Sequence, residues 1–213
     1  MMKLFIPLLF LSNIAIGQTN IERIIMSQLD NFIGDSINKS PNKAYNKRIS
    51  LKQIDKSQSK IDIRLYRLLG LSNTKLMRRI YIVDTTWKAQ EFDEWNNPVV
   101  INKHKLYVNP SFDSLILKLL SYNILTLPPQ DSLKTRMKKL TDETDEGYPV
   151  YSTLRVNDGY GYTIEIKVGN KFRIYEFDNP EEYSKYYDNV SELKDYVSIV
   201  RTFTDYLSKI NSR

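Results

Sequence analysis

The chain has 213 residues, a formal net charge of +6 and no cysteine, which excludes thiol nucleophiles, thiolate metal ligands and a lipid-modified cysteine. With 41% hydrophobic residues it is large enough to bury a core without disulfides. The 31 basic residues are spread among 25 acidic ones without a basic tract, and no known nucleic-acid-binding motif occurs, so we predict no nucleic-acid partner.

Residues 1–17 have the pattern of a secretory signal peptide. The single cation Lys3 precedes an apolar run over residues 4–11, and small residues two positions apart end the segment at Gly17. Cleavage after Gly17 would leave Gln18 as the mature N-terminus. We therefore predict an exported, soluble protein, located in the periplasm or outside the cell.

A membrane anchor is the alternative for this segment. The apolar run is interrupted by Pro7, Ser12 and Asn13, and it is shorter than the roughly 20 apolar residues that a span needs. No later segment reaches that length without charges. We therefore predict no membrane span in the mature chain.

The first half of the mature chain shows one helix and several strands. A capping box at Thr19 and Glu22 predicts a helix to about residue 33, followed by a long polar loop. Alternating or β-branched residues then predict two antiparallel strands, at 61–69 and 76–83. Residues 84–98 have neither period and are predicted to be irregular.

The middle of the chain is predicted to hold a short hairpin and two helices. Residues 99–101 and 106–108 flank a polar turn over 102–105. Asn109 and Pro110 are predicted to open an amphipathic helix. A short basic helix at 131–140 and an acidic loop at 141–147 follow.

The C-terminal third predicts a three-stranded meander and a long last helix. Asn157-Asp158-Gly159 and Gly169-Asn170 are hairpin turn sequences. The registers that they imply place one set of apolar side chains on one face. That set comprises Val150, Leu154, Tyr162, Ile164, Ile166, Tyr175 and Phe177. Beyond a short helix at 180–188, an amphipathic helix from residue 189 to the terminus is predicted to pack on the meander.

We therefore predict an α+β fold, in which antiparallel strands, including the C-terminal three-stranded meander, pack with amphipathic helices. Residues 18–213 form a single domain in this prediction, and 18–127 and 128–213 could be two sub-regions of it.

Candidates for catalysis are few. The only histidine, His104, lies between Lys103 and Lys105 in the predicted turn, where positive neighbours disfavour both a metal and an imidazolium. No nucleophile elbow, phosphate loop or zinc-binding helix motif occurs. Residues 142–146 loosely resemble the start of a calcium loop but lack the bidentate glutamate, so whether this acidic loop binds a cation stays open. We predict no metal site and no cofactor.

The candidate binding residues lie in the segment predicted to be irregular. Acidic residues there flank Trp87 and Trp95, a combination that suits a sugar-binding cleft and, with paired carboxylates, glycoside hydrolysis. The alternative is that the tryptophans fill the core edge while the acids face water. The predicted binding residues are Trp87, Trp95, Asp84, Glu91 and Asp93.

The predicted function is non-catalytic binding of a protein or an envelope glycan, with no catalytic residue assigned. A carboxylate-based glycan hydrolase is the alternative. The two differ in whether two of the acids Asp84, Glu91, Asp93 and Glu94 converge in one cleft.

Overall fold

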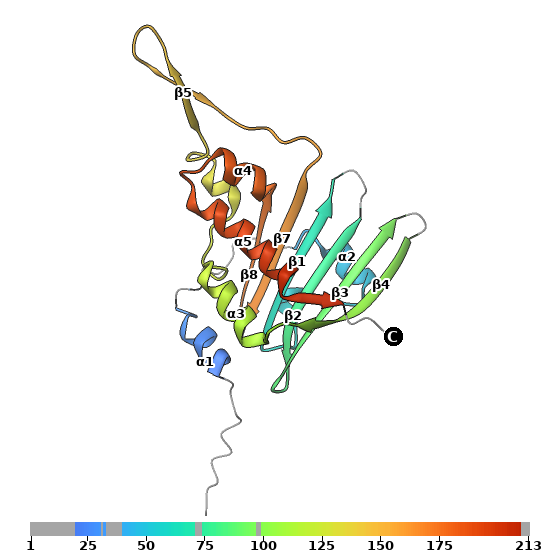
Figure 1. The fold of residues 1–213 in the computed structure, drawn as a ribbon. Coiled ribbons are helices and arrows are strands. Elements are labelled where there is room, and N and C mark those ends of the chain that lie inside the picture. Colours follow the sequence, from blue (N-terminus) through green and yellow to red (C-terminus); the bar gives the residue numbers. More distant parts are fainter. Residues whose placement is uncertain (1–19, 31, 33–39, 71–73, 97–98, 210–213) are drawn as a thin grey trace, which may run out of the picture.

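A seven-stranded antiparallel sheet dominates the fold (Figure 1). The structure is a computed structural model that describes residues 20–30, 32, 40–70, 74–96 and 99–209. The strand order is β8-β7-β1-β2-β3-β4-β9. These strands are β1 (Ile61–Leu69), β2 (Lys75–Val83), β3 (Thr86–Asn96), β4 (Val99–Val108), β7 (Tyr160–Val168), β8 (Lys171–Asp178) and β9 (Leu207–Lys209).

Helices cover both faces of this sheet. On one face, called the helix face here, lie α1 (Asn20–Ser27), α3 (Phe112–Ser121), α4 (Pro180–Tyr186) and α5 (Ser191–Asp205). The opposite face, called the α2 face, is covered by α2 (Lys43–Arg48) and the short 3-10 helix η1 (Ile54–Lys56) (Figure 1). A second 3-10 helix, η2, spans Gln130–Leu133.

The main core lies on the helix face. It joins apolar residues of α1, α3 and α5 to the inward side chains of the strands, among them Ile63, Ile80, Ile164 and Phe203. The α2 face has a smaller apolar cluster of Tyr45, Ile49, Tyr66, Met77 and Phe92.

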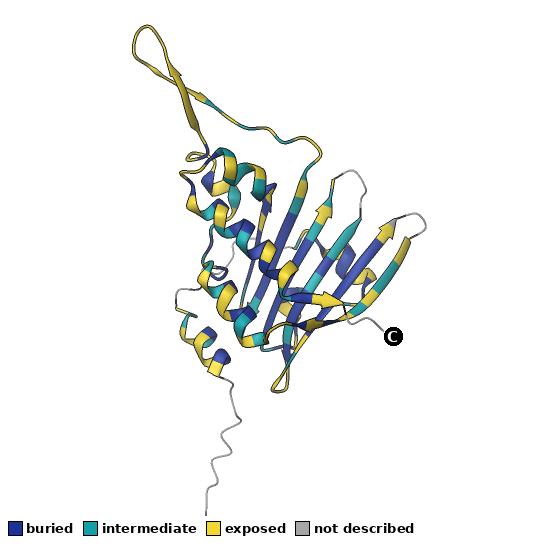
Figure 2. Cartoon of the chain, in the orientation of Figure 1, coloured by how far each residue is buried: buried dark blue, intermediate teal, exposed yellow. Residues whose placement is uncertain are grey.

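Strands β1 and β7 are buried on both sides over most of their length, and Figure 2 draws them largely in dark blue. In β1 the alternate residues Asp62 and Arg64 are as fully buried as their apolar neighbours. Thr163 of β7 points to the face opposite its core neighbours Tyr162 and Ile164, and it is buried there as well.

The predicted fold class is wrong. The protein is mostly antiparallel sheet, strands outweigh helices, and the described residues form no C-terminal three-stranded meander. The turn at Gly169 and its register are confirmed, since Ile164 pairs with Tyr175. The other neighbour of β7, however, is β1, in place of the segment around residue 154.

That segment instead contributes to a separate hairpin. Strands β5 (Lys139–Glu143) and β6 (Pro149–Ser152) pair only with each other and project from the body with exposed side chains (Figure 2). The hairpin replaces the end of the predicted 131–140 helix and most of the predicted acidic loop. Its strands expose apolar side chains, so an apolar residue in this sequence does not by itself indicate a core strand.

Two further predictions in the middle of the chain are wrong. Residues 84–98, predicted to be irregular, contain the whole of β3, and residues 99–108 form one continuous strand in place of a short hairpin. The β3 sequence has few aliphatic residues, and its order comes from pairing with β2 and β4 on both edges. The antiparallel pairing of 61–69 with 76–83 is confirmed.

Helix boundaries also differ from the prediction. Ser111, and not Asn109, caps α3, and its side chain accepts a hydrogen bond from the Ser114 amide. The last helix ends at Asp205, and the chain continues into β9. Across the described ranges, every helix is too short or too polar to cross a bilayer. The predicted signal peptide and Thr19 lie outside the described residues.

Candidate functional site

Strand β3 brings four of the five predicted binding residues onto one side of the sheet. Successive side chains of a strand point to opposite faces, so Trp87, Glu91, Asp93 and Trp95 all lie on the helix face. Asp84 does not join them, because it lies in the exposed turn before β3, with a left-handed φ of 57°.

Trp87 belongs to the core edge. Its ring is half-buried and stacks on Phe112, with ring centroids 6.0 Å apart and planes 20° apart. The buried indole nitrogen has no hydrogen-bond partner in the described part of the chain. Trp87 and Phe112 line a cavity of about 450 Å³ at the point where β4 leaves β3 to pair with β9.

Trp95 is presented to solvent near the far end of β3. Its exposed fraction is 59%, and Val100, opposite it on β4, is also exposed. An indole and an isopropyl group side by side make an apolar platform on the helix face. The two tryptophans therefore differ in role, since one packs into the core and the other is available to a ligand.

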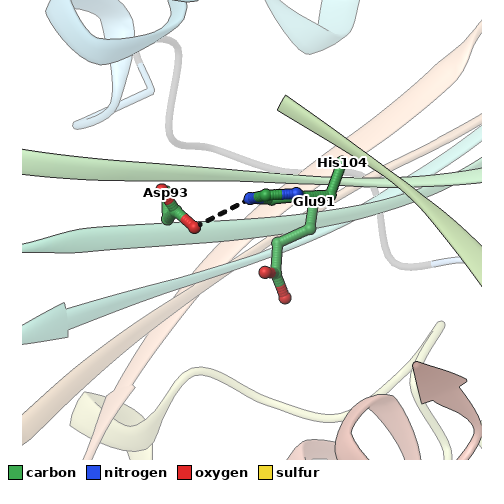
Figure 3. Close-up of side chains that lie close together, drawn as sticks. All are labelled: Glu91, Asp93 and His104. Atoms are coloured by element: carbon green, nitrogen blue, oxygen red, sulfur yellow. Dashed lines mark hydrogen bonds and ion pairs between the residues drawn. The ribbon is translucent and has the colours of Figure 1, made fainter. Parts of the chain in front are cut away.

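Next to this platform, Glu91 and Asp93 of β3 and His104 of β4 form a compact cluster (Figure 3). Their ligand-type atoms all lie within 4.8 Å of one another. Asp93 Oδ2 is 3.2 Å from His104 Nε2, and Asp93 Oδ1 accepts a hydrogen bond of 2.7 Å from Asn102. Two carboxylates thus converge here, closer together than the roughly 5–10 Å that separates the paired carboxylates of glycosidases.

Basic residues neutralise both carboxylates. The ammonium of Lys209, on β9, lies 2.9 Å from Glu91 and 3.2 Å from Asp93. Arg78 of β2 donates from Nε to Glu91 over 2.8 Å. Two positive side chains thus face the two carboxylates. Glu91 can therefore be almost completely buried without an uncompensated charge.

The same contacts set the ionisation of the group. Burial alone would raise the pKa of Asp93, but hydrogen bonds from Asn102 and Lys209 hold it below its ordinary value. The bond to Glu91 raises the pKa of Lys209. Asp93 is thus an ionised acceptor at neutral pH, whereas a general acid in glycoside hydrolysis needs a raised pKa.

Carboxylate and imidazole groups at these distances are also a ligand set for a divalent cation. The ammonium of Lys209 contacts both carboxylates, so a cation would have to displace it. In the described part of the chain, these three side chains form the one such group. The acidic residues 142–146 form none and lie along the exposed β5–β6 hairpin and its turn.

His104 is misplaced by the sequence-based prediction. It lies within β4, opposite Glu91, and bonds to Asp93 instead of occupying an exposed turn. Sequence reasoning also missed Asn102 and Lys209. Asn102 and His104 share the two-residue spacing of Glu91 and Asp93, and this is the signal that could have paired the two strands.

Glu94, the remaining acid of this segment, points to the α2 face. Its carboxylate accepts two hydrogen bonds from Arg48 Nη2 and one of 3.0 Å from Nε. It therefore takes no part in the cluster.

Comparisons of this chain with models of protein families, with curated protein sequences and with solved structures find no match.

Proposed function

We propose that the protein is a non-catalytic binding protein and that a glycan of the cell envelope binds on the helix face of β3 and β4. The observation that supports this proposal is the exposed ring of Trp95 beside the hydrogen-bonded side chains of Asp93, Asn102 and His104. An indole offers a flat apolar surface to the C–H face of a sugar ring. The carboxylate, amide and imidazole groups beside it can take hydroxyls.

The test separates Trp95 from Trp87. Trp95→Ala should abolish retention on an array of envelope glycans and leave the melting temperature nearly unchanged, because the ring makes little buried contact. Trp87→Ala should lower the melting temperature by several degrees, because it removes the stacking on Phe112. Glycan retention and differential scanning fluorimetry measure the two effects.

Tyr107→Ala is the matched control, since Tyr107 is an equally exposed aromatic residue on the α2 face of β4. It should change neither retention nor melting. If Trp95→Ala binds glycans as well as the wild type does, the platform is not a glycan site. Retention of a protein from an envelope extract that depends on Trp95 would then favour the other predicted partner class.

A carboxylate-based glycan hydrolase is the second candidate, favoured by the convergence of Glu91 and Asp93. The contacts of Lys209 with both carboxylates weigh against it, since neither is free to protonate a leaving group. Release of reducing ends from a bound glycan, lost in Glu91→Gln, would support hydrolysis. Retention without release supports binding alone.

Export fits this proposal, because an envelope glycan is met only outside the cytoplasm. The support is the pattern of residues 1–17. N-terminal sequencing of the exported product should begin within a few residues of Gln18. A product recovered from the cytoplasm with Met1 intact would contradict export.

A further inference from the structure

A cavity lies on the α2 face, on the side of the sheet away from Trp95. It measures about 630 Å³ and is bounded by residues 50–60 and by β1 and β2. Eight of its thirteen lining residues carry a hydroxyl or a basic group. The lining residues used here are Lys52, Ser57, Ser59, Arg64, Arg79 and Tyr81.

Two guanidinium groups at this cavity share one carboxylate. Arg64 Nη2 and Arg79 Nη2 each donate to Asp62 Oδ2 over 2.8 Å. Asp62 and Arg64 are completely buried, and Arg79 is 9% exposed. The second carboxylate, Glu165, lies 3.3 Å from Arg64. Only Asp62 therefore contacts both arginines.

Arg79 retains a donor that the fold does not use. Its Nε and Nη2 bond to Asp62, and Nη2 lies 3.4 Å from the hydroxyl of Ser59, but Nη1 makes no hydrogen bond to any described residue. The guanidinium also lies over the ring of Tyr81, 3.8 Å from its centroid. Stacking and the bonds to Asp62 fix the orientation of this group, which is favourable for binding an anion.

Further positive charge lies in the cavity and elsewhere on the same face of the sheet. Lys52 lines it and is exposed, and Lys88, Lys103 and Lys105 are exposed on the same face of β3 and β4. None of the four forms a salt bridge with a described acidic residue. The exposed carboxylate of Asp84 at the rim is the opposing charge. The cavity thus keeps an excess of positive charge that attracts anions.

The two buried acids have pKa values shifted in opposite directions. Burial raises the pKa of Glu165, although Arg64 opposes the shift. Burial would also raise the pKa of Asp62, but Arg79 and Arg64 keep it below its ordinary value. Asp62 is therefore the ionised carboxylate that both guanidinium groups share, and Arg79 still has Nη1 for a further acceptor.

We propose that this cavity is a second binding site, specific for an oxyanion group such as phosphate or sulfate. Arg79 Nη1 and the ammonium of Lys52 would hold the oxyanion, with the Ser59 hydroxyl beside them. The site is separate from the proposed glycan surface, because the sheet lies between them.

Isothermal titration calorimetry of the mature chain with inorganic phosphate, pyrophosphate and sulfate tests the proposal, with chloride at matched ionic strength as the blank. At least one oxyanion should bind saturably with one site per chain and raise the melting temperature. Lys52→Gln should weaken binding roughly fivefold. Arg79→Lys keeps the charge but loses the fork geometry, and should weaken it at least about tenfold.

Lys194→Gln, which removes the same charge from the exposed side of α5, is the control and should bind like the wild type. Trp95→Ala should also bind like the wild type, so this site and the glycan surface can fail separately. Saturation by none of the three anions would overturn the proposal. Equal weakening by Lys52→Gln and Lys194→Gln would also overturn it, because the attraction would then be diffuse. If Arg79→Lys does not fold, the affinity of Lys52→Gln for the oxyanion decides whether the proposal stands.

Discussion

Asp62 compensates the charges of two arginines on the α2 face. It accepts hydrogen bonds from both Arg64 and Arg79 and from the Ser57 hydroxyl, and it is completely buried. Asp62→Asn keeps the volume but leaves two buried guanidinium groups without their shared counter-charge. We expect a loss of about 3–5 kcal/mol in the free energy of unfolding, measured by urea denaturation.

Asp55→Asn, which changes an exposed carboxylate of η1, is the control and should leave the denaturation midpoint nearly unchanged.

The pKa of Asp62 is lowered in the folded state, so its stabilisation is present above pH about 4 and lost as the pH falls through the folded value. Glu165 acts in the opposite sense, because its raised pKa favours folding at low pH. The acid-dependent loss attributable to Asp62 should be missing in Asp62→Asn. A variant as stable as the wild type would contradict this account.

At the same scale, the sequence indicates which segment holds the candidate site better than it indicates what each side chain contacts. Tryptophans and carboxylates in one short segment indicated a site, and β3 does bring Trp95, Glu91 and Asp93 onto one face. The roles of Trp87 and His104 could not be predicted. Each depends on a partner from another element, Phe112 for Trp87 and Asp93 for His104.

At the scale of elements, one close contact joins the end of the β7–β8 hairpin to α4. Asn179, which precedes α4, accepts a hydrogen bond of 2.8 Å from the Tyr160 amide and donates its own amide to the Tyr160 carbonyl over 2.9 Å. A Cβ on Gly159 would lie 1.6 Å from Asn179 Oδ1. Gly159→Ala should therefore displace the Asn179 side chain and cost about 1–3 kcal/mol in stability by urea denaturation.

A double-mutant cycle checks the cause. Asn179→Gly suits the left-handed φ of 42° at this position and removes the atoms that would clash. In that background Gly159→Ala should cost much less than in the wild type. Equal costs in the two backgrounds would mean that Gly159 is required for another reason.

Elements fixed by neighbouring residues were predictable, and those fixed by distant ones were not. The hairpin at Gly169 follows from its turn sequence, and its register is as predicted. Strand β3 lacks an apolar period, and Glu91 is buried because Arg78 of β2 and Lys209 of β9 supply opposite charges. The meander prediction failed because a turn and an apolar face do not specify which strand occupies the other edge of β7.

For the whole molecule, two strand pairings are long-range. Ile61 of β1 pairs with Val168 of β7, and β4 pairs with β9, so the sheet joins the predicted sub-regions 18–127 and 128–213 at two places. The main core also mixes the two, since Leu115 of α3 and Phe203 of α5 belong to one cluster. Neither sub-region retains a complete sheet or core without the other.

Unfolding should therefore be a single cooperative transition over residues 18–213. Both tryptophans lie in β3, within the first sub-region, whereas ten of the fifteen tyrosines lie between residues 148 and 206. Tryptophan fluorescence and the tyrosine near-ultraviolet circular dichroism signal thus report mainly on different sub-regions. In urea the two signals should give the same midpoint and slope. Loss of the β1–β7 pairing opens the shared core, and this changes the surroundings of the tryptophans and the tyrosines together. Val200→Asp in α5, which places a charge against the core, should lower the free energy of unfolding by several kcal/mol and shift both midpoints together to lower urea. Separate midpoints, or a shift confined to the tyrosine signal, would show that 18–127 and 128–213 unfold as independent units.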